Sequence, residues 1–309
     1  MVIPVYNSAP SLPVLIERLH PVLTRSCEDY EIILVNDGSQ DDSWEVLRQL
    51  CCRFGQVRGI DLTRNYGQHN ALLAGIRAAR HDTIVTLDDD LQHPPEEIPL
   101  LLDKLAEGYD VVYGTPTQER HDVWRSLASR VTKWVLQRAM GANTARMVSA
   151  FRAFRTPLRD AFAGYRGAVV SIDVLLTWGT TRFTAIPVRH DPRYHGESTY
   201  TLSRLATHTL NMLTGFSVWP LRAASVVGFA FVLFGAGVLL YVVGRYLLQG
   251  DRVPGFPFLA SMIAIFSGAQ LFALGVIGEY LAGIHVRSME RPPYVVRVAV
   301  ATAADTDAG

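Results

Sequence analysis

The sequence predicts an α/β domain of the doubly wound type, followed by an interfacial helix and two transmembrane helices. Three observations predict this fold. Strand-like and helix-like segments alternate through residues 1–115, three consecutive acids follow a β-branched segment at Asp88–Asp90, and two long runs without a charged residue lie late in the chain. Alternating strands and helices are typical of a parallel sheet with helices on both of its faces.

The first part of the chain is expected to contain five strands and four helices. The strands are expected at Val2–Tyr6, Glu31–Val35, Val57–Leu62, Thr83–Leu87 and Asp110–Tyr113. The helices are expected between them, at Ser11–Leu23, Asp41–Cys52, Gln68–Ala79 and Pro95–Glu107. In an open sheet of this kind, ligands bind at the carboxyl ends of the strands.

Polar segments follow four of these strands in turn, at Tyr6–Ser8, Asn36–Ser39, Thr63–Asn70 and Asp88–Asp90. Each of them could be an ordinary turn, because Asp-Gly and Asn-Tyr-Gly are common turn sequences. Four such segments at one edge of a sheet favour a shared binding site instead.

The three acids predict a metal site at that edge. Asp88 and Asp90 alternate in an extended chain, so both should point to one side and share a hard cation, while Asp89 points away. Gln92 continues the same face with a neutral oxygen. The alternative is an acidic turn that caps the following helix, where acids are favoured by the helix dipole.

Composition and absent motifs exclude several classes of function. Lys+Arg and Asp+Glu both number 29, so a net charge of zero gives no reason to expect a nucleic-acid partner. The chain has no G-x-G-x-x-G after its first strand and no G-x-x-x-x-G-K-[ST]. A dinucleotide-dependent dehydrogenase and a P-loop NTPase are therefore disfavoured. A nucleotide that is bound through its diphosphate and a metal ion remains as a candidate ligand.

The late apolar runs predict a membrane hairpin. Ala223–Gly244 and Val253–Gly278 carry no charge, and each exceeds the ~20 residues that span a hydrocarbon core. Two spans place both ends of the chain on one side of the membrane. An apolar stripe at helical spacing precedes them, as in a helix that lies in the interface. We therefore expect a domain over 1–200, an amphipathic juxtamembrane helix over 201–220, a two-helix hairpin over 221–282 and a tail over 283–309.

These motifs together resemble those of the polyisoprenyl-phosphate glycosyltransferases of family 2, which have the GT-A fold. The segments that carry the resemblance are Val2–Asn7, Asn36–Ser39, Arg64–His69, Asp88–Glu97, Arg193–Tyr200 and Gly278–Tyr280. The resemblance runs from Val2 to about Val296, and it is specific as a set of motifs. It implies a nucleotide-sugar donor, a polyprenyl phosphate acceptor, and often a tetramer with cytoplasmic catalytic domains.

The resemblance also implies roles for individual residues. Asp37 would read the base, with Pro4, Tyr6 and Asn7 shaping the nucleotide pocket. Asp88, Asp90 and Gln92 would hold Mg²⁺ or Mn²⁺ on the diphosphate, and Arg64 and Gln68 would face the donor sugar. Arg193, Ser198 and Tyr200 would contact phosphate. Arg152 is expected to orient a phosphate, and it completes a predicted catalytic set with Asp88, Asp90 and Arg193.

Two positions depart from the family pattern. Ser8 stands where many relatives have Glu, and Ala150 stands where some relatives have an acid proposed as the catalytic base. A phosphate monoester has its second pKa near ~6 and is largely dianionic at pH 7, so such an acceptor needs no base. We therefore expect a direct displacement that inverts the anomeric centre.

The predicted function is metal-dependent transfer of a sugar from a nucleotide sugar, expected to be UDP-linked, to a polyprenyl phosphate such as undecaprenyl or decaprenyl phosphate. The predicted location is the inner membrane, with the catalytic domain and both termini cytoplasmic. The alternatives are a catalytically weak or dead nucleotide-binding membrane scaffold, and a glycosyltransferase that uses a hydroxyl acceptor. A membrane glycan polymerase should show a Gln-x-x-Arg-Trp motif, which is absent.

Overall fold

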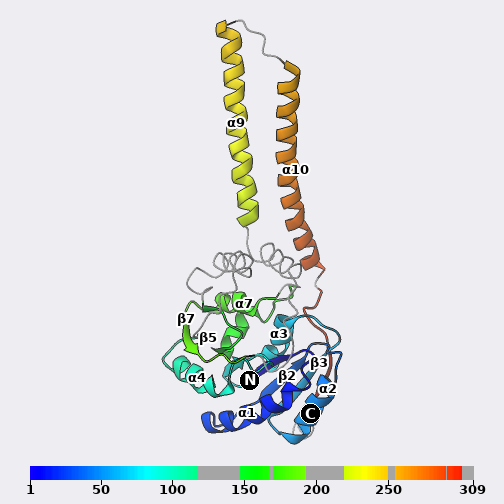
Figure 1. Cartoon of the computed structure of the whole chain (residues 1–309), viewed down its shortest axis with the longest axis vertical. Coiled ribbons are helices and arrows are strands. Elements are labelled where there is room, and N and C mark those ends of the chain that lie inside the picture. The colour runs from blue at the N-terminus through cyan, green and yellow to red at the C-terminus, as the bar shows by residue number, and fades with distance from the viewer. Residues whose placement is uncertain (117–146, 168–169, 193–218, 250–254, 290, 301–309) are drawn as a thin grey trace. The chain divides into compact units, whose positions relative to one another are not determined.

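The computed structural model describes residues 1–116, 147–167, 170–192, 219–249, 255–289 and 291–300 (Figure 1). Contacts divide the chain into two units. The first comprises Met1–Ala206 with Glu290–Gly309, and the second comprises Thr207–Met289.

The first unit is a mixed α/β structure built on one eight-stranded sheet. Its strands are β1 (Val2–Val5), β2 (Ile32–Asn36), β3 (Val57–Leu62), β4 (Thr83–Thr86), β5 (Val111–Pro116), β6 (Arg152–Arg155), β7 (Phe183–Val188) and β8 (Val296–Val300). Their order across the sheet is β7-β5-β6-β4-β1-β2-β3-β8. The five strands expected from the sequence are confirmed as β1 to β5, with ends that differ by at most three residues.

The four predicted helices of this unit are present as α1 (Ser11–Ser26), α2 (Ser43–Arg53), α3 (Gln68–Ala78) and α4 (Ile98–Ala106), with the 3-10 segment η1 (Pro95–Glu97) before α4. The helix α7 (Ile172–Gly179) and the 3-10 segment η2 (Thr156–Phe162) are additional elements that were not predicted from the sequence. The predicted helix at Pro95–Glu107 is therefore a 3-10 turn followed by α4. Proline is well tolerated at such a first turn because it lacks the N–H that would be unpaired there.

The inner strands β1 to β4 are buried on both faces, and two apolar clusters account for this. Side chains of α1, α2 and α4, such as Leu15, Leu47 and Leu101, pack with Ile3 and Val5 on one face. On the other face Leu72 of α3 and Leu175 of α7 pack with Val2, Ile33 and Val35. Adjacent residues of β1 thus point to opposite faces, as the period of a strand requires.

The five predicted strands run parallel, as expected, but the sheet also contains two antiparallel strands that were not predicted from the sequence. β1 to β4 are parallel, and β5 is parallel to β7, but β6 pairs antiparallel with β4 and β5. β8 pairs antiparallel with β3 at the edge of the sheet. The sequence prediction covered only the strands that alternate with helices in residues 1–115, whereas antiparallel strands need no helical crossover.

The C-terminal segment also differs from its prediction. Residues 283–309 were expected to form a separate tail, yet β8 is the outermost strand of the main sheet. Arg297 of β8 binds the buried carboxylate of Asp61 on β3, with 3.2 Å between Nη1 and Oδ2, and donates to the Thr63 carbonyl at 2.8 Å. Asn36 donates to the other oxygen of Asp61 at 2.7 Å. This interaction gives β8 a polar anchor as well as its strand pairing.

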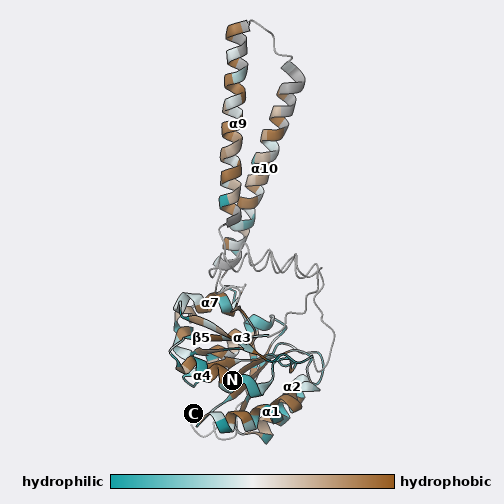
Figure 2. Ribbon diagram, turned by 60° about the vertical axis from the view of Figure 1, so that its left-hand side comes forward, coloured by the Kyte–Doolittle hydropathy of each residue, from teal (hydrophilic) through white to brown (hydrophobic). Residues whose placement is uncertain are grey.

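The second unit contains two long helices, α9 (Trp219–Gln249) and α10 (Gly255–Ser288). Each contains a stretch long and apolar enough to cross a membrane, at Leu221–Tyr241 and Ile265–His285. Figure 2 shows hydrophobic residues along both helices, and most of their large apolar side chains are exposed. Of the amphipathic helix predicted over 201–220, residues 201–218 lie outside the described residues, and 219–220 begin α9.

The anchoring of β8 can be tested by removing its arginine. Arg297→Ala should lower the free energy of unfolding by about 1–3 kcal/mol, because the buried Asp61 carboxylate would keep only the Asn36 amide as its side-chain donor. The measurement is thermal unfolding of the full chain in detergent. Arg53→Ala is the control, since its partner Glu17 and Arg53 itself are both exposed and such pairs contribute ~0–1 kcal/mol. Equal losses in the two variants would contradict the anchoring role.

Candidate active site

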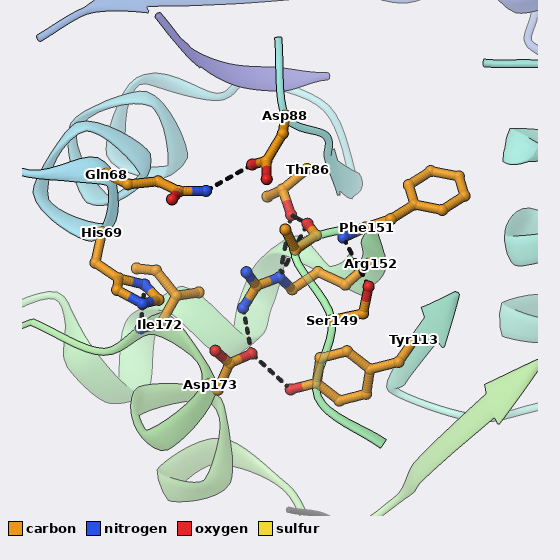
Figure 3. Close-up of polar contacts among 11 residues, drawn as sticks. Gln68, His69, Thr86, Asp88, Tyr113, Ser149, Phe151, Arg152, Ile172 and Asp173 are labelled. Carbon is orange, nitrogen blue, oxygen red and sulfur yellow. Dashed lines mark hydrogen bonds and ion pairs between the residues drawn. The ribbon is translucent and has the colours of Figure 1, made fainter. Parts of the chain in front are cut away.

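Four polar loops meet at the carboxyl ends of the parallel strands β1 to β4, as the sequence predicts for a shared site. The Tyr6 backbone N–H donates to Asp89 Oδ2 at 3.2 Å, which joins the loops after β1 and β4. The Asn7 N–H donates to Ser39 Oγ at 3.0 Å, which joins the loops after β1 and β2. Gln68, at the start of α3, donates to Asp88 Oδ1 at 2.5 Å (Figure 3).

Asp37 holds the loops after β2 and β3 together. Its two carboxylate oxygens accept the backbone N–H groups of Tyr66 and Gly67 at 2.7 and 2.8 Å, and the residue is only 3% exposed. Burial raises the pKa of Asp37, and these two hydrogen bonds oppose that rise. The structure therefore shows a carboxylate bonded to its own fold, and the direct contact with a base stays a prediction.

Close contact between these same loops explains the glycine at position 38. Gly38 has a φ of +65°, and a Cβ there would lie 2.5 Å from the carbonyl carbon of Arg64 and from the nitrogen of Asn65. Only glycine allows both the left-handed backbone and this approach. The Asn-Asp-Gly-Ser motif is thus required by the packing of two loops at the site.

The expected nucleotide-pocket residues lie along this edge. Pro4 is buried inside β1, while Tyr6 is 45% exposed at its end. Asn7 adopts a φ of +53° and accepts the Gln40 N–H through its side-chain oxygen at 2.8 Å. Arg64 places its guanidinium over the Tyr66 ring, 4.6 Å from the ring centre. The exposed groups are therefore aromatic and cationic, which suits a base and a phosphate.

The acidic segment after β4 forms a turn, and this corrects its predicted geometry. The chain was expected to stay extended through Asp88 and Asp90, but Asp89 and Asp90 lie in a turn and Leu91 has a φ of +60°. The Gln92 N–H donates to Asp90 Oδ1 at 3.1 Å and closes the turn. A buried leucine in the left-handed region is strained, and such strain persists where the surrounding structure enforces it.

Asp89 is turned inward, as expected of the acid that points away from the cation. Its side chain accepts hydrogen bonds from Ser8 and from the Tyr6 backbone, and burial raises its pKa to about 6. All three acids of the segment are partly exposed, and Asp88 and Asp90 are the two that were expected to bind the cation. The position of Ser8, where many relatives have Glu, thus contacts the acidic turn.

The donor set of this turn fits a magnesium or manganese ion bound together with a diphosphate. No cluster of three or more His, Cys, Asp or Glu side chains suited to a metal occurs among the described residues. Mg²⁺ bound with a nucleotide does not need one, because it takes one or two carboxylates and fills its other positions with phosphate oxygens and water. Asp88 and Asp90 supply two carboxylates, and the Gln92 amide supplies a neutral oxygen.

The segment after β7 is docked on the acidic turn. The Asp191 N–H donates to the Gln92 carbonyl at 2.8 Å, and the rings of His93 and His190 pack edge to face with centres 5.0 Å apart. Burial lowers the pKa of His93 to about 4, so its imidazole is neutral at pH 7. The predicted phosphate ligands Arg193, Ser198 and Tyr200 lie outside the described residues.

Arg152 occupies a different environment from the one expected of a phosphate ligand. It is 2% exposed and forms an ion pair with Asp173 of α7, and its Nε donates to Thr86 Oγ1 at 3.1 Å (Figure 3). Tyr113 donates to the same Asp173 oxygen at 3.0 Å. The guanidinium is therefore already paired inside the domain, because β6 places it between two inner strands of the sheet.

Four residues of this region were not identified from the sequence: Thr86, Tyr113, Asp173 and His69. Arg152 lies among apolar residues in Phe151–Phe154, as in a buried strand, where an arginine requires an acidic partner. Asp173 carries a second signal, since acids are favoured in the first turn of a helix. Neither signal predicts that Asp173 and Arg152 form an ion pair with each other.

The chain was compared with known families and proteins. The family described as glycosyl transferase family 2 matches residues 1–164. The undecaprenyl-phosphate 4-deoxy-4-formamido-L-arabinose transferase of Edwardsiella ictaluri is 38% identical over 301 residues, covering 96% of this chain and 92% of that protein. The enzyme of the same name from Serratia proteamaculans is 38% identical, covering 97% and 93%.

One similar solved structure is the glucosyl-3-phosphoglycerate synthase of M. tuberculosis, with a TM-score of 0.49 and 18% identity over 69% of this chain and 77% of that one. The resemblance drawn from the motifs is confirmed by the family match and by the near full-length similarity to the two transferases. The chain belongs to glycosyltransferase family 2, and it is a glycosyltransferase with a GT-A-like sheet.

Proposed function

We propose that the chain transfers a sugar from a UDP-linked donor to the phosphate of a polyprenyl phosphate at the cytoplasmic face of the inner membrane. The observation that carries this proposal is the acidic turn at the carboxyl end of β4, with Gln68 donating to Asp88. The names of the relatives support the class of acceptor, since both are undecaprenyl-phosphate transferases.

The residues of the site suit a direct displacement. An oxygen of the acceptor phosphate forms a bond to the anomeric carbon while the bond from that carbon to the diphosphate breaks, and the nucleoside diphosphate leaves with the electron pair. The configuration at the anomeric carbon inverts. Asp88, Asp90 and Gln92 would hold a divalent cation, which would supply positive charge against the departing diphosphate. The guanidinium of Arg64 lies at the same sheet edge, and Arg193 is assigned to phosphate by the resemblance.

Ala150 favours a phosphate acceptor over a hydroxyl acceptor. Its methyl side chain cannot take a proton, and its carbonyl accepts the Thr86 hydroxyl at 2.7 Å. A sugar hydroxyl needs a base at the moment of attack, whereas a phosphate dianion already carries the attacking charge.

The topology of the first unit supports a membrane hairpin. β8 pairs with β3 in the same sheet as the N-terminal strands, although α9 and α10 lie between them in the chain. If α9 crosses a membrane, α10 must therefore cross back. We assign residues 1–200 with β8 to a cytoplasmic catalytic domain, α9 and α10 to the membrane, and a homotetramer to the assembly.

The function is tested by supplying membranes that contain the chain with undecaprenyl phosphate and a panel of UDP- and GDP-linked sugars. Mass spectrometry should detect one glycolipid whose mass equals that of the lipid phosphate plus one glycosyl residue. Nucleotide-sugar binding without any such product would favour the scaffold, and transfer to a lipid-linked hydroxyl would favour the second alternative.

The metal assignment predicts the effect of neutralising the acids. Asp88→Asn and Asp90→Asn should each lower turnover by at least about 100-fold, because the cation would lose a charged ligand. EDTA should abolish activity, and Mn²⁺ or Mg²⁺ should restore it. Asp103→Asn is the control, since Asp103 is an exposed acid on α4. Full activity in excess EDTA would refute the metal assignment.

The acceptor assignment predicts the pH dependence of the rate. The acid limb of kcat/KM for the lipid should follow the second ionisation of the acceptor phosphate, near ~6. A polyprenyl phosphonate has a higher second pKa, so it should move this limb to higher pH in the same enzyme. Ala150→Asp should give little gain with either acceptor. A limb that stays in place when the acceptor changes would belong to a protein group, and would contradict the proposal.

A further inference from the structure

The first turn of α7 contacts two segments that lie close to Asp88 in the chain or in space. On one side Asp173 is paired with Arg152, whose Nε donates to Thr86 at the end of β4, two residues before Asp88. On the other side the Ile172 N–H donates to His69 Nδ1 at 3.4 Å, and His69 follows Gln68, which donates to Asp88. Figure 3 shows Gln68 in contact with Asp88, and Arg152 in contact with both Thr86 and Asp173.

The register of the sheet explains why the first branch is rigid. Thr86 of β4 and Tyr113 of β5 are the direct neighbours of Arg152 on β6. Asp173 accepts from both Arg152 and Tyr113, and Thr86 Oγ1 accepts from Arg152 while donating to the Ala150 carbonyl at 2.7 Å. Every side chain of the group therefore has a partner, which fixes the direction of the Thr86 hydroxyl and the end of β4.

Packing does not require this ion pair. Ile172, Leu175 and Leu176 already bury α7 in the core, and a buried ion pair often contributes no more stability than apolar side chains of similar volume. The stability of α7 alone therefore does not account for the ion pair. The position of the ion pair beside the acidic turn indicates a role there.

We infer that the Arg152–Asp173 ion pair and His69 are positioning residues that set the geometry of Asp88 for a divalent cation and a nucleoside diphosphate. This inference rests on the proposed function of the acidic turn. It assigns Arg152 to the donor side of the reaction, acting through Thr86, instead of to direct contact with the acceptor phosphate. Groups that orient metal ligands commonly change metal affinity when they are altered, although they do not touch the metal.

The test measures Mn²⁺ binding to the full chain in detergent, in the presence of UDP, from the loss of the free-ion EPR signal. Asp173→Asn and Arg152→Lys should weaken this binding by about tenfold. The KM for undecaprenyl phosphate should stay within about twofold of wild type, because neither residue contacts the acceptor. Glu31→Gln is the matched control, since Glu31 forms the partly buried pair with Arg58 at 2.5 Å on a different part of the sheet.

A second pair of variants covers the case in which Asp173→Asn does not fold. His69→Ala removes the acceptor for the Ile172 N–H, whereas His69→Gln offers an amide oxygen in its place. Mn²⁺ binding should weaken in the alanine variant and recover in the glutamine variant, while both unfold at the wild-type temperature.

The outcomes separate the inference from the function on which it rests. Wild-type protein that binds no Mn²⁺ with UDP would refute the proposed metal site itself. Wild-type binding with an unchanged Mn²⁺ affinity in Asp173→Asn and His69→Ala would overturn the inference alone. A raised KM for undecaprenyl phosphate in Arg152→Lys, at unchanged Mn²⁺ affinity, would indicate instead that Arg152 acts on the acceptor phosphate.

Discussion

Parallel pairing of β1, β2, β3 and β4 is the constraint on which the site depends. Because these strands run in one direction, the loops that follow them reach the same edge, and hydrogen bonds then join them there. Backbone N–H groups of one loop are satisfied by side chains of another, as when Asp37 accepts from Tyr66 and Gly67. The polar motifs therefore serve the fold and the ligand together, and their spacing follows from strand and helix lengths.

Much of this arrangement could be predicted from the sequence, and the misses have physical causes. The alternation of strand-like and helix-like segments and the β-branched residues predicted β1 to β5. The order of the polar motifs predicted the edge of the sheet at which the candidate site lies. The geometry of the acidic turn was missed because an extended chain was assumed, whereas Leu91 takes a positive φ that leucine rarely adopts. β6 and β8 were not predicted as members of the sheet. The prediction relied on strands that alternate with helices, and antiparallel strands can pair without a crossover helix.

Arg152 illustrates a different limit. A sequence shows an arginine in a basic segment, and a solvated or phosphate-binding role is then the natural expectation. Its burial depends on Asp173, 21 residues away, and on the neighbours that sheet register supplies, Thr86 and Tyr113. Local patterns do not encode such partners. The same holds for Asp37, whose carboxylate was assigned to a ligand and is engaged by the backbone 29 and 30 residues further on.

The place of β8 adds a constraint on the membrane hairpin that hydropathy alone does not give. Arginines flank both ends of the apolar pair, so the distribution of positive charge says little about orientation. β8 is nevertheless paired with β3 and held by the Arg297–Asp61 contact. The catalytic sheet thus contains chain from before α9 and from after α10, and it can form only if both ends of the hairpin lie on one side. Under the proposed function the site uses a cytoplasmic nucleotide sugar, which would place that side in the cytoplasm, so the sheet that carries the candidate site would also determine the topology of the membrane segment.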